Sequence, residues 1–328
     1  MTLLLDDATV QSVFDWKTAI SALRDAYAGP DDPGRFPARG IARAGSSWLR
    51  SLSGAPSVGG LMGVKIIAAA LEVRRASYLI ALFDQRSAEL VALLDGNSIT
   101  GYRTAATSAL AADLLAVPGA LDVAVIGSGF EARKHIRALA AVRDLKSVRV
   151  YSPRPRGRAS FVAELADAIS PAPILPAKTP EAAVAGAALI VCAARSYDET
   201  PVLRGQWLTA GTTVVSIGST MPEQRELDTA ALARADVLIA DVLDEVLHDT
   251  GDLIAARAAD VDPTGKAASL ADLIGGRHPG RTGDGQVIVY KSVGSALQDL
   301  TVAGVCARVA RERGLGCVLP SVIEPAQK

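Results

Sequence analysis

Short runs of Val, Ile and Leu alternate with helical patterns over the second half of the chain. The apolar runs lie between residues 121 and 293 and read LDVAVI, SVRVYS, AALIVCAA, TTVVSIGS, ADVLIAD and QVIVYKS. Near-continuous apolar strands separated by helices are typical of a parallel sheet that helices cover on both faces. The pattern therefore predicts a doubly wound α/β domain over residues 120–295.

The first 119 residues follow a different pattern. The segment DWKTAISALRDAY spaces its apolar residues as an amphipathic helix does, and a loop rich in Gly and Pro follows it. Next come the β-type runs LMGVKIIAAA, ASYLIALFD and ELVALLDG, and then an Ala-rich helix that ends before Pro118. Together with the helical stretch after residue 296, these elements predict a discontinuous α+β domain, residues 1–119 completed by 296–328.

Composition narrows the class of protein. The 328 residues suffice for about two domains, and 49% hydrophobic with 21% charged residues is ordinary globular usage. A net charge of −1 gives no reason to expect nucleic acid as a partner. The chain starts with an acidic stretch and has no apolar run of membrane-spanning length, so we expect a cytoplasmic protein without a membrane partner. The three cysteines and three histidines fit no metal spacing.

A glycine-rich turn follows the first strand of the predicted α/β domain. Residues 127–132 match G-x-G-x-x-A between the strand VAVI and a helical pattern. In that setting the glycines allow backbone N–H groups to approach a pyrophosphate at the N-terminus of the helix. We expect the cofactor to be bound by Gly127, Ser128, Gly129, Phe130, Glu131 and Ala132.

The end of the second strand indicates which dinucleotide is preferred. NAD enzymes usually have Asp or Glu there for the ribose hydroxyls, whereas this chain has Ser152 followed by Arg154, Arg156 and Arg158. Guanidinium groups suit a 2′-phosphate, although any one of these arginines is at least as readily a solvated loop charge. The cluster favours NADP(H), with NAD(H) possible.

Several ordered blocks carry a resemblance to a known family. They are DGNSITGYRTAA at 95–106, the GSGFEA turn, GSTMPEQRELD at 218–228 and KSVG at 291–294, together with the upstream Lys65. Over essentially its full length the chain resembles the ornithine cyclodeaminase/mu-crystallin family. The resemblance implies a Rossmann domain, a substrate-binding and dimerisation domain, a homodimer, and an amino acid or imine as substrate. It leaves the reaction open, because similar members include cyclodeaminases, ketimine reductases, alanine dehydrogenase and opine-type dehydrogenases.

The resemblance assigns catalytic roles to Lys65, Arg103 and Arg39. Lys65 is the only charge in an apolar strand, where burial would lower its pKa and suit it to acid–base work on an imine; the alternative is an exposed strand lysine. Arg103 would clamp a substrate carboxylate, or else form a buried structural ion pair. By the same resemblance, Arg39 matches a second arginine that contacts the substrate carboxylate.

Other residues are placed around the two ligands. Thr100 and Thr220 would line the substrate pocket, Thr104 would contact the carboxylate or a cofactor phosphate, and Ala193 and Val293 would lie near the nicotinamide. Thr220 stands where cyclodeaminases of this family have a catalytic aspartate, and threonine is no base at neutral pH. Asp228, beyond the proline, is expected to cap a helix.

The sequence therefore favours an NAD(P)H-dependent reductase that converts a carboxylate-bearing imine, of the Δ1-pyrroline- or Δ1-piperideine-2-carboxylate type, to an L-amino acid. Alternatives are an ornithine or lysine cyclodeaminase that recycles NAD+, an opine-type or alanine dehydrogenase, and a non-catalytic NADPH- or small-ligand-binding protein of the mu-crystallin type.

Overall fold

The computed structural model describes residues 1–30, 32–196, 198–320 and 323–326. It consists of two compact units, Met1–Arg103 with Ser295–Lys328, and Thr104–Gly294. Helix α3 (Asn97–Leu115) belongs to both units, and the division falls inside it. The boundary predicted from the sequence lies at residue 119, after this helix, because a hydrophobic pattern shows where a helix ends and not which core it packs against.

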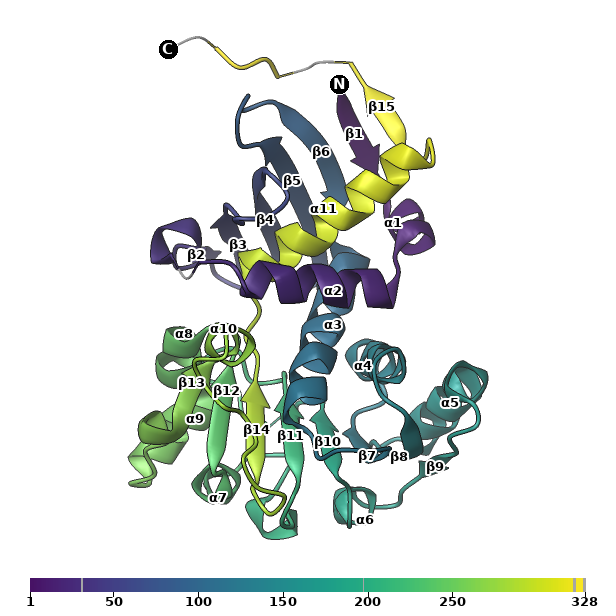
Figure 1. Ribbon diagram of the computed structural model, residues 1–328, viewed down its shortest axis with the longest axis vertical. Helices are drawn as coiled ribbons and strands as arrows, with labels where there is room; N and C mark the ends of the chain where they lie inside the picture. Colours follow the sequence, from purple (N-terminus) through teal and green to yellow (C-terminus); the bar gives the residue numbers. More distant parts are fainter. Residues whose placement is uncertain (31, 197, 321–322, 327–328) are drawn as a thin grey trace. The chain divides into compact units, whose positions relative to one another are not determined.

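The second unit is built on a parallel eight-stranded sheet (Figure 1). Strands β10, β11, β12 and β14 are buried at every residue. Successive side chains of a strand point to opposite faces, so both faces of the sheet are covered, as the apolar runs predict. The strands, in the spatial order of the sheet, are β9 (Ile174–Pro176), β8 (Leu145–Tyr151), β7 (Leu121–Ile126), β10 (Leu189–Cys192), β11 (Thr213–Ser216), β14 (Ile288–Lys291), β12 (Val237–Ala240) and β13 (Ala267–Ser269).

This strand order defines a Rossmann-type sheet. The chain runs β7, β8, β9 toward one edge and then returns to place β10 on the other side of β7. Ligands of such sheets bind outside the carboxyl ends of the strands at the point of reversal, here between β7 and β10. The connecting helices are α4 (Phe130–Ala140), α5 (Pro155–Leu165), α6 (Pro180–Val184), α7 (Thr229–Arg234), α8 (Leu243–Asp249), α9 (Gly251–Ala258) and α10 (Leu270–Ile274).

The first unit contains a mixed seven-stranded sheet. All neighbours pair antiparallel except β1 with β6. The order is β15 (Cys317–Leu319), β1 (Thr2–Leu5), β6 (Leu90–Asp95), β5 (Arg75–Asp84), β4 (Leu61–Ala70), β3 (Ser47–Gly54) and β2 (Gly40–Ala44). The predicted runs become β4, β5 and β6. The sheet is completed by β2 and β3, which precede these runs, and by β1 and β15, none of which the sequence pattern predicts.

Helices cover one face of this sheet. Helix α11 (Ala296–Glu312) crosses the strands beside α2 (Trp16–Tyr27), and α1 (Asp7–Val13) lies nearby (Figure 1). The chain thus returns through α11 to the unit where it began. Asp6, Asp15 and Ser295 cap the three helices through their side chains.

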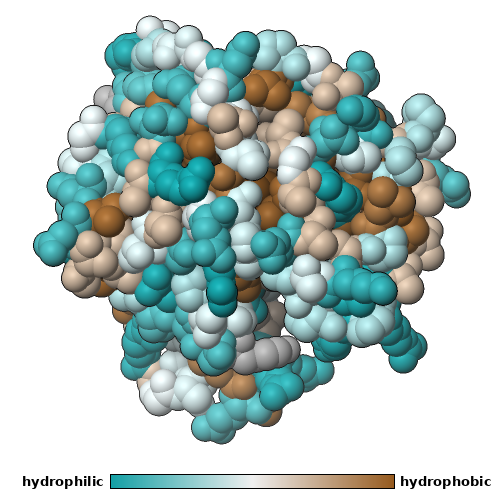
Figure 2. Space-filling view, turned by 90° about the horizontal axis from the view of Figure 1, so that it is seen from below, coloured by the Kyte–Doolittle hydropathy of each residue, from teal (hydrophilic) through white to brown (hydrophobic). Residues whose placement is uncertain are grey.

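No helix of the described residues is long and apolar enough to cross a lipid bilayer. On the face of the molecule seen in Figure 2, hydrophilic side chains predominate and apolar ones form small separate groups.

Candidate active site and cofactor site

Lys65 is a buried cation of the first unit. It lies in the middle of β4 with 1% of its surface exposed. Its Nζ is 2.9 Å from Asp299 Oδ1 and 5.8 Å from the centre of the Tyr78 ring. Burial alone disfavours an ammonium, but a carboxylate at this distance favours it. The sequence shows only that Lys65 lies in an apolar strand, where burial would lower its pKa. In the structure, the Asp299 carboxylate is the ion-pair partner of Lys65.

Arg103 converges on the same carboxylate from α3. Its Nε donates to Asp299 Oδ1 at 3.0 Å, and its Nη1 donates to Gln298 Oε1 at 2.7 Å. Arg103 therefore forms a buried ion pair, which is one of the two roles expected from the sequence; the other is to hold a substrate carboxylate. One carboxylate oxygen holds both Lys65 and Arg103, so two cations of the predicted site are brought together.

Asp299 is a candidate functional residue that the sequence does not reveal. It lies in the first turn of α11 and is fully buried, and its second oxygen, Oδ2, has no hydrogen-bond partner among the described residues. The adjacent Gln298 donates to the Tyr27 hydroxyl at 2.8 Å, which fastens this turn to α2. The polar pair QD stands among mostly apolar residues in the first turns of this helix, but the partners of Asp299 lie more than 190 residues away in the sequence.

The remaining predicted substrate residues occupy varied positions. Arg39 is half-buried directly before β2. Thr100, in the first turn of α3, donates its hydroxyl to the carbonyl of Gly96 at 2.7 Å. Thr104 is buried, 8% exposed, and is the first residue of the second unit.

The glycine-rich turn of the second unit has the geometry that a dinucleotide site requires. Gly127 has φ +118°, and a Cβ there would lie 2.6 Å from the carbonyl oxygen of Ala193 at the end of β10. Only glycine fits such an approach. Around Gly129, by contrast, the space is open, since a Cβ would meet no atom within 4 Å.

Helix α4 begins directly after this turn. Gly129 is its N-cap and provides no side-chain hydrogen bond to the first turn. Phe130 is exposed, Glu131 is half-buried, and Ala132 packs fully buried against the sheet. An open cradle before a helix N-terminus that no side chain caps fits the pyrophosphate of a dinucleotide.

The region after β8 fits the proposed 2′-phosphate site in part. Ser152 is buried and accepts a hydrogen bond from Ser128 Oγ at 2.9 Å. Arg154, the exposed N-cap of α5, and Arg156 face solvent, while the Arg158 guanidinium donates to the carbonyl of Ser152. Arg158 thus has a structural contact, which leaves Arg154 as the better-placed candidate for a phosphate.

Two further predicted residues lie at the carboxyl ends of strands. Val293 follows β14, and its N–H donates to Asp241 Oδ1 at 2.9 Å. Thr220 follows β11, and its N–H donates to Gln224 Oε1 at 2.9 Å.

Two other polar or reactive residues have structural roles. As predicted, Asp228 caps a helix, α7, by accepting from Ala231 N. Cys192 is a buried core residue. Among the described residues, no group of three His, Cys, Asp or Glu side chains is placed to hold a metal ion.

The fold and these clusters define an α/β protein with a Rossmann domain and a second domain that carries a buried lysine–aspartate–arginine cluster. The family model of the ornithine cyclodeaminase/mu-crystallin family matches residues 62–314. The chain therefore belongs to the ornithine cyclodeaminase/mu-crystallin family.

Individual relatives represent more than one reaction. The chain is 31% identical over 239 residues to a Δ(1)-pyrroline-2-carboxylate reductase of Bacillus cereus, covering 73% of this chain and 72% of that protein. A crystal structure of a probable ornithine cyclodeaminase from Bordetella pertussis superposes with a TM-score of 0.86 at 30% identity, covering 97% of this chain and all of that one. The Δ(1)-pyrroline-2-carboxylate reductase of Thermococcus litoralis, in complex with NADH and L-proline, superposes with a TM-score of 0.89 at 25% identity, covering 97% and 100%.

Proposed function

We propose that the protein is an NAD(P)H-dependent reductase of a carboxylate-bearing imine, of the Δ1-pyrroline- or Δ1-piperideine-2-carboxylate type, and that the product is an L-amino acid. The observation that carries the proposal is the buried Lys65, paired with the Asp299 carboxylate beside Arg103. An imine reductase needs a proton donor, a cation for the carboxylate and a hydride source. The similarity to two pyrroline-2-carboxylate reductases supports this set of roles.

In this proposal each side chain has one task. Lys65 donates a proton from Nζ to the imine nitrogen, and Asp299 keeps that ammonium charged and oriented. Arg103, whose orientation is fixed by Asp299 and Gln298, attracts the substrate carboxylate, with Arg39 as a second cation. Thr100 lines the substrate pocket. A general acid of this kind contributes roughly 10²–10⁴-fold to a rate.

The cofactor would be held by the cradle from Gly127 to Ala132, with Ser152 and Arg154 at its adenosine end and Ala193 and Val293 at its nicotinamide end. When bound, a reduced nicotinamide supplies the hydride. The residues at the strand ends around the nicotinamide ring would hold that ring in place and exclude water from it.

The proposal is tested by incubating the protein with NADPH and Δ1-pyrroline-2-carboxylate or Δ1-piperideine-2-carboxylate. We expect a substrate-dependent loss of nicotinamide absorbance and formation of L-proline or L-pipecolate. Ammonia release from ornithine or lysine without net cofactor oxidation would instead identify a cyclodeaminase. Thr220 argues against that outcome, because it provides no carboxylate and its hydroxyl donates to Gln224 Oε1 at 3.2 Å. Tight NADPH binding without turnover of any imine would identify a binding protein.

Cofactor preference gives a separate prediction. Replacing Arg154 by Ala should weaken NADPH binding by roughly 10- to 100-fold, the loss of one charged hydrogen bond to the 2′-phosphate, and should leave NADH binding nearly unchanged. Fluorescence titration with both cofactors measures this. Lys146→Ala, at the exposed amino end of the same strand β8, is the matched control for loss of a surface charge. Equal losses for NADPH and NADH would show that Arg154 does not contact the 2′-phosphate.

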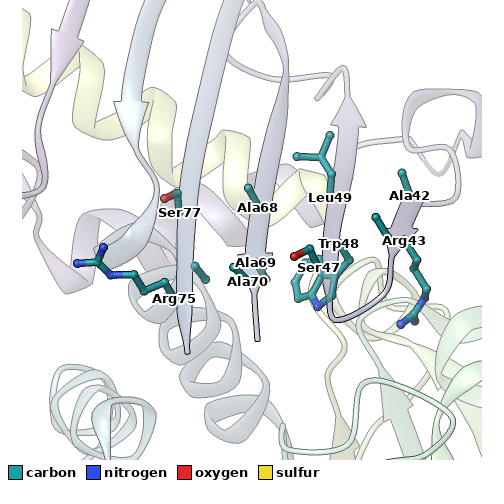
Figure 3. A pocket seen from close by; sticks show the side chains of 12 residues that line it. Ala42, Arg43, Ser47, Trp48, Leu49, Ala68, Ala69, Ala70, Arg75 and Ser77 are labelled. Atoms are coloured by element: carbon teal, nitrogen blue, oxygen red, sulfur yellow. The ribbon is translucent and has the colours of Figure 1, made fainter. Parts of the chain in front are cut away.

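The first unit also offers a surface for the homodimer that we propose. On the face of the sheet opposite Lys65, cross-strand neighbours form the row Ala42, Leu49, Ala68 and Ser77. Figure 3 shows the pocket at this part of the sheet, which is lined by Ala and Ser side chains together with Trp48 and Leu49, with Arg43 and Arg75 at its two sides. Leu49 of this row is 48% exposed, and Leu79, two residues after Ser77 on β5, is 42% exposed. An apolar sheet face that helices of its own unit leave uncovered suits a second copy of the chain.

We therefore expect Leu49→Asp together with Leu79→Asp to convert a dimer to a monomer, because each would bury an unpaired charge in the interface. Light scattering coupled to size-exclusion chromatography measures the mass. Leu175→Asp, on the exposed strand β9 of the second unit, should leave the dimer intact. A wild-type protein that is monomeric, or a double variant that stays dimeric, would refute this surface.

A further inference from the structure

Buried charged side chains meet where strands β11 and β14 end, and the roles assigned above do not use them. Lys291, Asp252 and Glu226 are each 0% exposed. The Lys291 ammonium lies 3.0 Å from Asp252 Oδ2 and donates to Ser216 Oγ at 2.9 Å. The Ser216 hydroxyl in turn donates to Glu226 Oε2 at 2.6 Å. A continuous polar relay therefore connects the last residue of β14, the last residue of β11 and Glu226.

Glu226 also fixes the turn that follows β11. The Gly218 N–H donates to Glu226 Oε2 at 2.8 Å. A Cβ on Gly218 would lie 2.4 Å from Glu226 Oε1, so the carboxyl packs directly against the backbone of the turn and leaves room only for glycine. Glu226 is held in place in turn, because its N–H donates to Asp252 Oδ1 at 2.8 Å. Glu226 thus binds the Gly218 end of the turn, while Ser219 and Thr220 are bound by Gln224.

The turn lies at the carboxyl ends of the parallel strands, where ligands of such sheets bind. The G-x-G-x-x-A cradle follows β7, and strands β8 and β9 extend from β7 toward the adenosine side. In a doubly wound sheet the other half of the dinucleotide lies over the carboxyl ends of the strands beyond the reversal, here β10, β11 and β14. Gly218 and Thr220 are therefore on the nicotinamide half of the crevice.

We propose that Glu226 is a positioning residue for the nicotinamide half of the cofactor site, and that it acts by holding the turn from Gly218 to Thr220 against the ends of β11 and β14. The inference rests on the proposed function, because it requires a nicotinamide cofactor in this crevice. It assigns a role to the GSTMPEQRELD block, for which the sequence analysis gives Glu226 none.

The ionisation of Glu226 provides a means of testing this role. Burial raises the pKa of Glu226 from 4.5 to about 7, against the opposing effects of Lys291, Ser216 and the Gly218 N–H. A carboxylate accepts hydrogen bonds more strongly than a carboxylic acid. The turn is therefore held more firmly above pH 7 than below it.

The groups that face Glu226 come from each neighbouring element. They are Cys192 of β10, Lys291 of β14, Asp252 of α9 and the adjacent Arg225, whose Nε lies 3.5 Å from Asp252 Oδ1. Burial, and then the charge of Glu226, raise the pKa of the Cys192 thiol well above its usual value, so that thiol stays neutral. Lys291 and Asp252 form an ion pair. Among these groups we assign the titration between pH 6 and 8 to Glu226.

The effect of this titration on the free energy of unfolding follows from the difference in the pKa of Glu226 between the folded and the unfolded protein. The pKa of Glu226 is raised in the folded protein, so the fold favours the protonated form. The stability that this group contributes is fully present below pH 4.5 and is lost as the pH rises through about 7. Glutamine keeps the shape and the acceptor oxygen but does not ionise, so Glu226→Gln should remove this dependence.

The test uses the full-length protein and the variant Glu226→Gln. The dissociation constant for NADPH and the melting temperature without cofactor are measured from pH 6 to pH 8. We expect wild-type NADPH binding to strengthen by about fivefold over this range relative to the variant, the difference between a charged and a neutral hydrogen bond. The 2′-phosphate also titrates near pH 6, but it does so in both proteins, so only their difference counts. The wild-type melting temperature should fall relative to that of the variant as the pH rises.

Glu223→Gln, three residues earlier and exposed, is the matched control and should behave as wild type in both measurements. A melting temperature that responds to Glu226→Gln with no change in the pH dependence of NADPH binding would show that Glu226 titrates without positioning the turn, and would overturn the proposal. Identical pH profiles of variant and wild type in both measurements would overturn it as well. Failure of the wild-type protein to bind NADPH or NADH would refute the proposed function itself.

Discussion

Replacing Lys65 by Met should reduce imine reduction by roughly 10²–10⁴-fold, the usual contribution of a positioned acid. Methionine keeps the apolar stem in the buried strand and removes only the ammonium, so NADPH binding should persist. The loss should appear in kcat more than in KM, because the proton is transferred in the transition state. Steady-state kinetics with NADPH and Δ1-pyrroline-2-carboxylate, together with a cofactor titration, measure both quantities.

Lys17→Met is the matched control for this variant, since Lys17 is an exposed lysine on helix α2 of the same unit. It should retain wild-type turnover. If Lys65→Met retained near-full turnover with an unchanged pH profile, the proton would have to come from water or from another side chain, and the role assigned to Lys65 would be wrong.

The second large effect is expected at Asp299. Asparagine has nearly the same shape but no charge, so Asp299→Asn leaves the Lys65 ammonium and the Arg103 guanidinium buried without their shared anion. Removing one partner of a buried ion pair typically costs about 3–5 kcal/mol of folding free energy. Urea denaturation should show a loss of this size, and turnover should fall because the ammonium is no longer oriented.

The comparison that isolates this effect uses two further variants. Asp25→Asn, on the exposed side of α2, should change stability by less than about 0.5 kcal/mol. Lys65→Met combined with Asp299→Asn should cost less than the sum of the two single changes, because the double variant leaves one fewer charge unpaired. Strictly additive costs would contradict the shared ion pair.

The parallel sheet could be predicted from the sequence because its strands are buried on both faces. Runs such as that of β10 are short, apolar at every residue and rich in β-branched Ile and Val, which favours a buried strand over a helix. The short strands β9, β13 and β15 were not predicted, because three residues are too few to show a period. Their pairing depends on neighbours that are distant in the sequence.

The residues of the candidate site likewise differ in how readily the sequence reveals them. Local motifs reveal the glycine-rich turn, and the isolated charge in an apolar strand reveals Lys65. Asp299 and Glu226 lie in segments whose local pattern is that of an ordinary helix or loop. Their importance comes from partners on other strands and helices, among them Lys65 for Asp299 and Ser216 for Glu226. Such partners appear only when the chain has folded.

The most direct measurement of the proposed reaction follows the hydride itself. The protein is incubated with NADPH that carries two deuterium atoms at C4 of the nicotinamide and with Δ1-pyrroline-2-carboxylate, and the amino acid formed is analysed by mass spectrometry and chiral chromatography. The proposed reduction predicts L-proline that carries one deuterium at Cα for each NADPH oxidised. Absence of deuterated proline under conditions in which a known pyrroline-2-carboxylate reductase produces it would contradict the proposed function.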